Sequence, residues 1–217
     1  MSPARPATVF TLHTIAALLL CFLLADLTHS APVSSSLEPP VALREAAERA
    51  KTLVEKIVRD IPAVHAAAVT TEGLTLDSAA QSTNLQLMVT SLGIPAAPVL
   101  KPPSEHFTLD VCVRRMLAGG RLYQGLLGVL SERVSGLSNL QADLRDLLTH
   151  VAKMKEAAPS GGEEAEPSLD LASRLHGDYE VQVAAHLTLM QLKSFCHDLI
   201  RSLRAVAAYR PRPPTKR

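Results

Sequence analysis

Histidine, cysteine and acidic side chains are the groups that could do chemistry in this chain of 217 residues. Beyond residue 30 the histidines are His65, His106, His150, His176, His186 and His197. No two of them stand four residues apart with a glutamate between, and no cysteine pair has the spacing of a zinc site. The sequence therefore predicts no metal ion and no cofactor.

The sequence also gives little support for nucleophilic catalysis or for phosphate binding. The chain has no Gly-x-Ser-x-Gly motif and no recognisable triad order. Its glycine pair Gly161-Gly162 is followed by glutamates, which would repel a phosphate. An enzyme is not expected. His186, beside Leu187 in an apolar stretch, is interpreted as an ordinary partly buried histidine, and His150 is expected on the exposed side of its helix.

Two cysteines, Cys112 and Cys196, remain beyond the first thirty residues. They could pair in an oxidising compartment. Both fall on predicted helices, however, Cys112 near a helix start and Cys196 well before a helix end, so their heights along a bundle differ. Two free, largely buried thiols are the favoured interpretation, with no disulfide expected.

Four charged residues could form one binding surface. Asp143 and Asp146 flank the apolar seam of one predicted helix, and Lys51 and Glu55 lie one turn apart on another and could pair. If these helices are neighbours, the four side chains make a mixed-charge patch. The alternative is a solvated helix face, as most charge runs are.

The first thirty residues have the pattern of a signal for secretion. Arg5 precedes an apolar run over 9–25, and small residues stand at the −3 and −1 positions before Ala31. This pattern predicts a secretory signal peptide over 1–30, cleaved after Ser30; the alternative is a membrane anchor, for which the run is short. A soluble secreted protein without membrane insertion after cleavage is expected. A net charge of +1 gives no reason to expect a nucleic acid partner.

The elements that must position the charged residues are helices. Aromatic residues make up only 3% of the chain, and alanine and leucine are abundant, which argues against a sandwich or barrel. Apolar periodicity predicts helices over about 41–61, 108–130, 137–154 and 169–209. Thr108 is the expected N-cap of the second helix. The third carries an unbroken apolar stripe, Leu137, Leu140, Leu144, Leu147, Val151 and Met154. Pro62 ends or kinks the first helix, and residues 63–69 could continue it past a kink. A short helix is possible over 77–89, and the last helix is open to a break around Gly177. Gly119-Gly120 indicates the close approach of a neighbouring backbone.

The lengths of the connections decide the topology. Residues 70–105 and 157–167 are long links, while 131–137 is a short turn. Long, short and long connections predict an all-α, four-helix, up-up-down-down bundle with two crossover loops. One domain over 31–209 is expected, followed by a basic, proline-rich tail over 210–217.

Five motifs, in order, resemble the granulocyte colony-stimulating factor family of helical cytokines. They are Ser91-Leu-Gly-Ile-Pro95, Cys112 with its spacing to Tyr123, Leu122-Tyr-Gln-Gly-Leu-Leu127, residues 137–146 and Leu192-Lys-Ser-Phe195 with Leu203-Arg204. The resemblance covers helices two to four and the end of the first long loop, whereas helix one matches only loosely.

The resemblance implies a secreted, monomeric haematopoietic cytokine that dimerises a class I cytokine receptor in a 2:2 complex. The family's main receptor site would use Asp143 and Asp146 with Lys51 and Glu55, and a second site would use Asn84 and Leu87. Asn84 stands where the family has an acidic residue. Pro102 stands where the family has the loop cysteine that pairs with the equivalent of Cys112.

Two other functions remain as alternatives. An interleukin-6-type cytokine would share the bundle and differ in its receptor. An extracellular lipid-carrying helical protein would also use amphipathic helices, but it would show tandem repeats and few long loops.

Overall fold

A computed structural model describes residues 41–76, 83–104, 108–156 and 170–209, which all belong to one compact unit, Leu37–Arg217. The predicted signal peptide, the acidic link at 157–167 and the basic tail lie outside the described residues. Every element is helical: α2 Val41–Ala68, α3 Thr83–Leu92, α4 Leu109–Ser131, α5 Ser138–Glu156, the 3-10 helix η2 Ala172–Arg174 and α6 Asp178–Ala207. The all-α prediction is confirmed.

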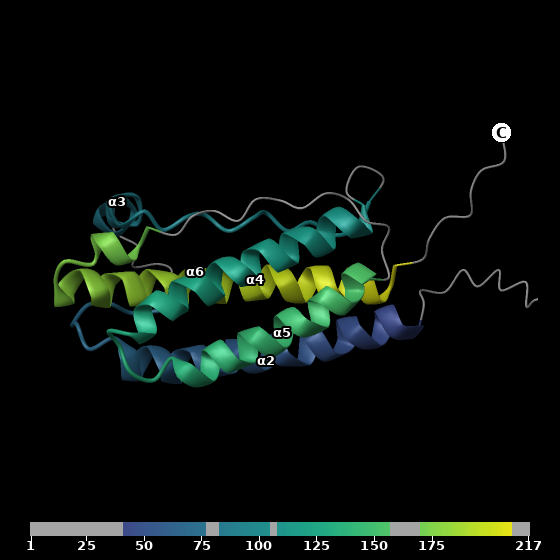
Figure 1. The fold of residues 1–217 in the computed structure, drawn as a ribbon, viewed down its shortest axis with the longest axis horizontal. Helices are drawn as coiled ribbons and strands as arrows, with labels where there is room; N and C mark the ends of the chain where they lie inside the picture. Colours follow the sequence, from purple (N-terminus) through teal and green to yellow (C-terminus); the bar gives the residue numbers. More distant parts are fainter. Residues whose placement is uncertain (1–40, 77–82, 105–107, 157–169, 210–217) are drawn as a thin grey trace, which may run out of the picture. The chain divides into compact units, whose positions relative to one another are not determined.

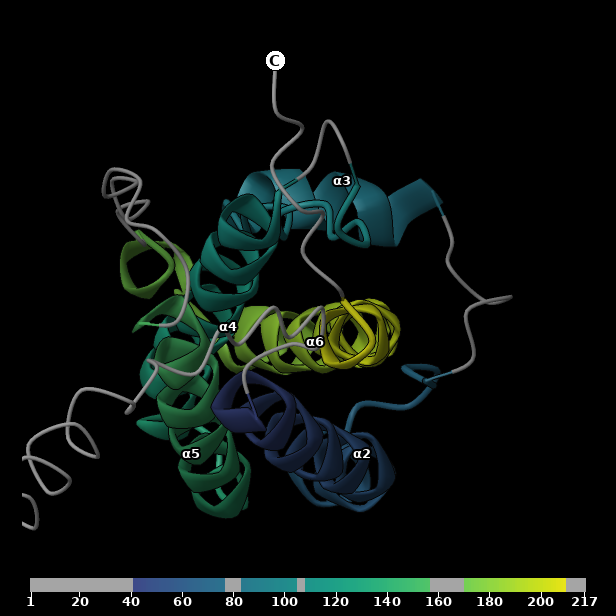
Figure 2. The ribbon, with the colours of Figure 1, turned by 90° about the vertical axis from the view of Figure 1, so that its right-hand side faces the viewer.

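Four long helices enclose the core. Seen end-on, α2, α4, α5 and α6 surround a common interior, and α3 crosses the bundle instead of running along it (Figure 2). Helices α2 and α4 each pack against both α5 and α6. Because α2 contacts α5, the neighbour relation that the predicted charge patch requires is present.

Contacts between the helices fix their directions. Helix α2 runs antiparallel to α5 and α6, because early residues of one helix meet late residues of the other: Arg49 with Lys153, Lys56 with Asp143, Glu55 with Arg204 and His65 with His186. Helix α4 is antiparallel to α5, as the contacts Gly120 with Leu148 and Ser131 with Gln141 require. In Figure 1, α2 and α4 accordingly run from right to left, and α5 from left to right.

Of the two outcomes that the sequence left open at Pro62, an end of helix α2 or its continuation, the structure has the continuation. It continues through Pro62 to Ala68, and the Val69 amide donates to the His65 carbonyl at 2.8 Å. An interior proline costs about 3 kcal/mol or more. The extra turns bury His65 and Ala68 against the bundle, and this burial offsets that cost.

Local caps set the ends of α3 and α4. The predicted 77–89 helix is found at Thr83–Leu92, and Gly93, with φ +66°, terminates it. A left-handed glycine is a common helix stop. The predicted N-cap Thr108 is confirmed, since its hydroxyl accepts from the Val111 amide at 3.3 Å.

The glycine pair of α4 makes room for side chains and not for a backbone. A Cβ at Gly119 would lie 2.4 Å from the Phe195 ring, and one at Gly120 would lie 2.7 Å from Leu148 Cδ2. The expectation of a close backbone approach was therefore wrong. The glycines instead allow α6 and α5 to insert these two side chains against α4.

The stripe predicted on α5 is buried throughout; its members are Leu137, Leu140, Leu144, Leu147, Val151 and Met154. The predicted break around Gly177 is present, because η2 precedes it and α6 starts at Asp178 with Gly177 as N-cap. Within the described residues, none of the helices is both long and apolar enough to span a bilayer.

Candidate functional site

The polar flank of α5 lies against α2 and is held there by a lysine. Lys56 Nζ bonds to Asp143 Oδ2 across the helix interface and also lies 3.2 Å from Asp60 Oδ2 on its own helix. Hydrogen bonds to Asp143 and then to Asp60 raise the pKa of Lys56. The Asp143 side chain is 16% exposed. This contact fixes the register between α2 and α5.

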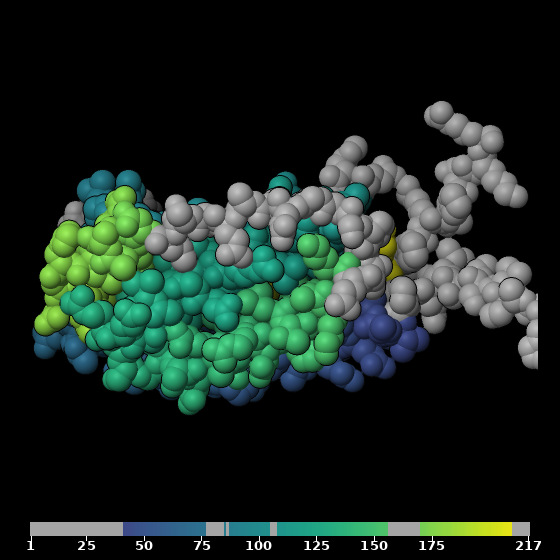
Figure 3. Space-filling model, in the orientation of Figure 1, coloured from purple at the N-terminus to yellow at the C-terminus, as the bar shows by residue number. Residues whose placement is uncertain are grey.

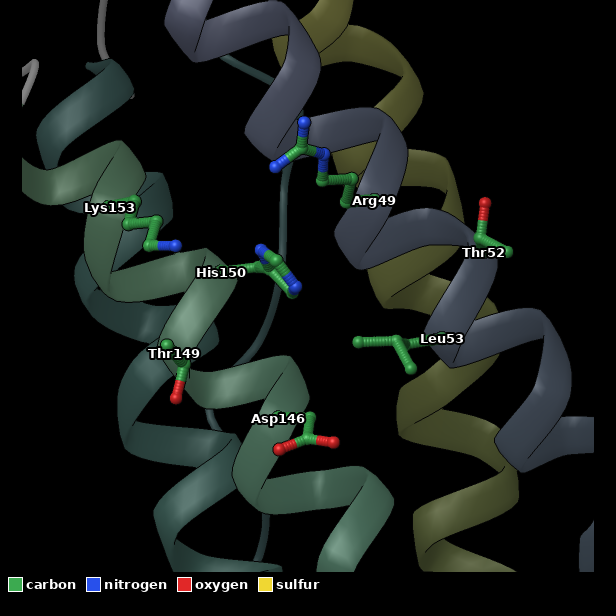
Figure 4. Close-up of a pocket in the computed structure, with 7 residues that line it drawn as sticks. All are labelled: Arg49, Thr52, Leu53, Asp146, Thr149, His150 and Lys153. Carbon is green, nitrogen blue, oxygen red and sulfur yellow. The ribbon is translucent and has the colours of Figure 1, made fainter.

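One turn further along α5, the two helices separate to form an open pocket of about 520 Å³. It is lined by Arg49, Thr52 and Leu53 from α2 and by Asp146, Thr149, His150 and Lys153 from α5 (Figure 4). In the space-filling view the surface of α5 lies between those of α4 and α2 (Figure 3). The pocket therefore belongs to the outer face of the α2–α5 pair.

His150 lies at the centre of this pocket, between the side chains of Arg49 and Lys153 (Figure 4). Its Nδ1 is buried and has no hydrogen-bond partner in the described part of the chain. Burial lowers the pKa of His150, and the charges of Lys153 and Arg49 lower it further, while Asp146 acts in the opposite direction. His150 thus lies on the outer side of α5, as expected, but its ring is half-buried in the pocket.

The structure brings the two predicted aspartates to α2, but Lys51 and Glu55 do not join them. Lys51 bonds to Glu48 within α2, and Glu55 Oε1 lies 3.8 Å from Arg204 Nη2 on α6. Lys51 and Glu55 thus do not pair with each other, and they occupy the flank of α2 that faces α6. The suggested pairing of Lys51 with Glu55 was therefore wrong, whereas the receptor role of the four residues remains a prediction.

Two other α2 residues occupy the place predicted for Lys51 and Glu55. Arg49 lines the pocket, and Lys56 lies one turn beyond Thr52 and Leu53 on the flank that faces α5. The sequence carried this signal, because these residues follow the i, i+3, i+4, i+7 spacing of one helix face. Which flank meets α5 could not be read from α2 alone.

The residues of the predicted second site lie on α3. Leu87 is 66% exposed, which is unusual for a leucine on a short helix beside a core. Asn84 also lies on α3, but its side chain is outside the described structure. Arg174 of η2 holds the end of this helix, because its Nη1 donates to the Ser91 carbonyl at 3.0 Å.

A buried histidine pair was missed by sequence reasoning. His65 Nε2 and His186 Nδ1 are 2.9 Å apart between α2 and α6, and both rings are buried. Burial lowers the pKa of His65, and burial together with the neighbouring His65 lowers the pKa of His186 to about 4. The sequence left open whether a helix continues past Pro62 to His65, and it did not indicate which distant residue His65 would meet.

Both cysteines are free and buried, Cys112 on α4 and Cys196 on α6. Burial raises the pKa of each thiol to about 12. Since the thiolate is the reactive form, neither residue is set up for chemistry. In the described segments, no three histidine, cysteine, aspartate or glutamate side chains gather as metal ligands would.

Comparison with known proteins identifies the family. The chain is 31% identical over 130 residues to bovine (Bos taurus) granulocyte colony-stimulating factor, covering 57% of this chain and 65% of that protein. The sheep (Ovis aries) protein is 30% identical, with 57% and 72% covered, and the human protein is 31% identical, with 57% and 61% covered. The match thus spans a little under two thirds of the bovine and human proteins. No family model matches the chain. On these similarities, together with the all-helical bundle, the chain belongs to the granulocyte colony-stimulating factor family.

Proposed function

We propose that this protein is a secreted haematopoietic cytokine that binds the ectodomain of a class I cytokine receptor of the granulocyte colony-stimulating factor receptor type. The observation that carries the proposal is the open pocket between α2 and α5, with Asp146 at its edge and Asp143 beside it. The similarity to colony-stimulating factors of mammals supports the same class of activity. Action on the granulocyte lineage is part of the proposal.

The two aspartates have different roles in this proposal. Asp143 is largely covered and bonded to Lys56, so it fixes the helix pair and presents little surface. Asp146 is exposed and makes no ion pair with any residue in the described segments, so its charge is available to a partner. Lys51 and Glu55 are proposed as contacts at the adjoining flank of α2, next to Arg204 of α6.

A second receptor contact is proposed on α3, around Leu87 and Asn84. An exposed leucine is the type of residue that gains from burial in an interface. Because α3 crosses the end of the bundle away from the pocket, one monomeric ligand could contact two receptor chains (Figure 1). Two such ligands and two receptors would give a 2:2 complex.

The test uses the full chain expressed with its own leader in mammalian cells and measures binding of the secreted product to the receptor ectodomain. We expect Asp146→Lys to weaken binding about tenfold or more, as reversal of a charge at an interface does. Glu132→Lys is the matched control, because Glu132 is exposed at the end of α4 and undergoes the same charge change.

Circular dichroism should show that both variants keep the helical content of the unmodified chain. The interleukin-6 receptor ectodomain serves as the specificity control. If the unmodified chain does not bind the granulocyte receptor, the proposed function is wrong. If Asp146→Lys and Glu132→Lys bind equally well, the receptor contacts the bundle elsewhere.

A further inference from the structure

The pocket between α2 and α5 is polarised along its length. Asp146 lies at one end and Lys153 at the other, with Arg49 of α2 near the lysine (Figure 4). Asp146 and Lys153 are seven residues apart on α5, which corresponds to about 10 Å along the helix axis. The pocket thus has an acidic end and a basic end.

These charges are available to a partner. Neither Asp146 nor Lys153 makes an ion pair within the described part of the chain. Arg49 lies 3.5 Å from Glu45, one turn away on its own helix, with both side chains more than half exposed. An exposed ion pair of this kind contributes only about 0–1 kcal/mol to stability, so Arg49 can leave Glu45 to bind a partner at little cost.

The pKa of His150 indicates that positive charge dominates at the basic end of the pocket. The charges of Lys153 and Arg49 lower its pKa, and their effects are larger than the opposing effect of Asp146. Its Nδ1 is shut off from solvent and unpartnered among the described residues. Because an orphaned N–H is rarer than an orphaned acceptor, the ring proton is favoured on Nε2, which then can donate to a ligand.

We infer that the basic end of this pocket takes a carboxylate side chain of the receptor, bound between Arg49 and Lys153, while a cationic side chain of the same receptor surface pairs with Asp146. This inference rests on the proposed function and adds the chemistry and the orientation of the partner. Arg49, His150 and Lys153 all line the pocket and can each donate to a carboxylate, and Leu53 of the same lining offers apolar surface to the aliphatic part of an acidic side chain.

The orientation follows from the separation of the charges. A receptor segment with an acid and a base about 10 Å apart fits in one direction only, because the reverse direction places like charges together. Such like-charge contacts are a common source of specificity between related partners. The pocket would therefore set the direction in which the receptor crosses the helix pair.

The test compares Lys153→Glu and Arg49→Glu with Arg59→Glu, an exposed α2 residue that is not among those lining the pocket. All three change the net charge by the same amount, so long-range steering is matched. We expect the two pocket variants to weaken binding to the receptor ectodomain at least about tenfold, and the control less than about threefold. Equal binding by all three variants would overturn the inference.

A second measurement reads the pocket directly. The pKa of His150 is followed by NMR in the free chain and in the complex. A bound carboxylate should raise this pKa, because it offsets Lys153 and Arg49, whereas a bound cation should lower it. A lowered or unchanged pKa in the complex contradicts the inference.

Two variants of His150 test whether its Nε2 donates a hydrogen bond to the ligand. His150→Gln retains a donor near the Nε2 position and should bind nearly as well as the unmodified chain, while His150→Phe should bind more weakly. Equal loss in both variants would show that the ring serves only packing and would remove the histidine from the site. If the unmodified chain does not bind the receptor at all, the proposed function and this inference fail together; if it binds and the charge variants are neutral, only this inference fails.

Discussion

At the scale of single residues, the His65–His186 pair is an interaction whose contribution to stability depends on pH. Two imidazoles 2.9 Å apart can share one proton between them, one ring donating and the other accepting. Protonation of both rings would put two positive charges at this distance inside the interface between α2 and α6. Burial lowers the pKa of both rings in the folded chain, and the neighbouring His65 lowers the pKa of His186 further.

The pair predicts a loss of stability in acid. Because the folded pKa of each ring lies below the ordinary value of 6.5, the unfolded chain takes up protons first as the pH falls. The contribution of the pair is complete above pH 6.5 and is lost as the pH falls toward 4, with a total on the order of 2–3 kcal/mol. Urea unfolding from pH 7.5 to 4 measures it.

His186→Leu is the comparison variant, since it removes one ring and keeps the site apolar. Carboxylates titrate in both proteins, so only the difference between the two slopes belongs to the histidine pair. Identical slopes between pH 6.5 and 4.5 would show that the pair carries no pH-dependent stability.

At the scale of elements, two glycines of α4 allow the effect of packing to be distinguished from the effect of helix propensity. Gly119 has no room for a Cβ, which would lie 2.4 Å from the Phe195 ring, whereas Gly128 on the same helix has nothing within 4 Å. Phe195 also packs against Tyr123, with ring centroids 5.3 Å apart. The ring therefore cannot move aside without disturbing a second aromatic contact.

We predict opposite effects of alanine at these two positions. Gly119→Ala should lower the free energy of unfolding by about 1–3 kcal/mol, the usual cost of overpacking a filled core. Gly128→Ala should raise it by up to about 1 kcal/mol, because alanine is the better helix former and meets no neighbour. Urea unfolding monitored by circular dichroism measures both, and a shift in the same direction for both variants would contradict the packing argument.

The elements also show where sequence reasoning succeeds and where it fails. The stripe of α5 and the cap at Thr108 are local patterns, and both were predicted correctly. The continuation of α2 through Pro62 and the side chain beside Gly119 depend on partners far away in the sequence. A local rule gives the free-energy cost of Pro62 inside the helix. It does not include the burial of His65 and Ala68, which outweighs that cost.

At the scale of the whole molecule, the same distinction applies to the candidate site. The position of Asp143 and Asp146 on the polar flank of α5 could be predicted, because the apolar stripe of that helix is unbroken. Arg49 and Lys56 were missed because the choice between the two flanks of α2 depends on which neighbour each flank meets. Lys51 and Glu55 satisfy the spacing rule equally well, yet Glu55 turns toward Arg204 of α6.

The two proposed receptor contacts lie on separate surfaces of one ligand. The pocket lies between α2 and α5, whereas Leu87 lies on α3, which contacts α6 and crosses the bundle (Figures 1 and 2). Leu87→Glu places a charge on the proposed second contact without entering the core, since this side chain is 66% exposed. We expect this variant to keep its binding to the first receptor chain and to stop at a 1:1 complex, whereas the unmodified chain assembles to 2:2. Light scattering of the mixed proteins gives the mass of each complex, and Asp146→Lys should instead lower the amount of every complex. If Leu87→Glu still forms the 2:2 assembly, or if both variants reduce it identically, the ligand does not use two independent surfaces.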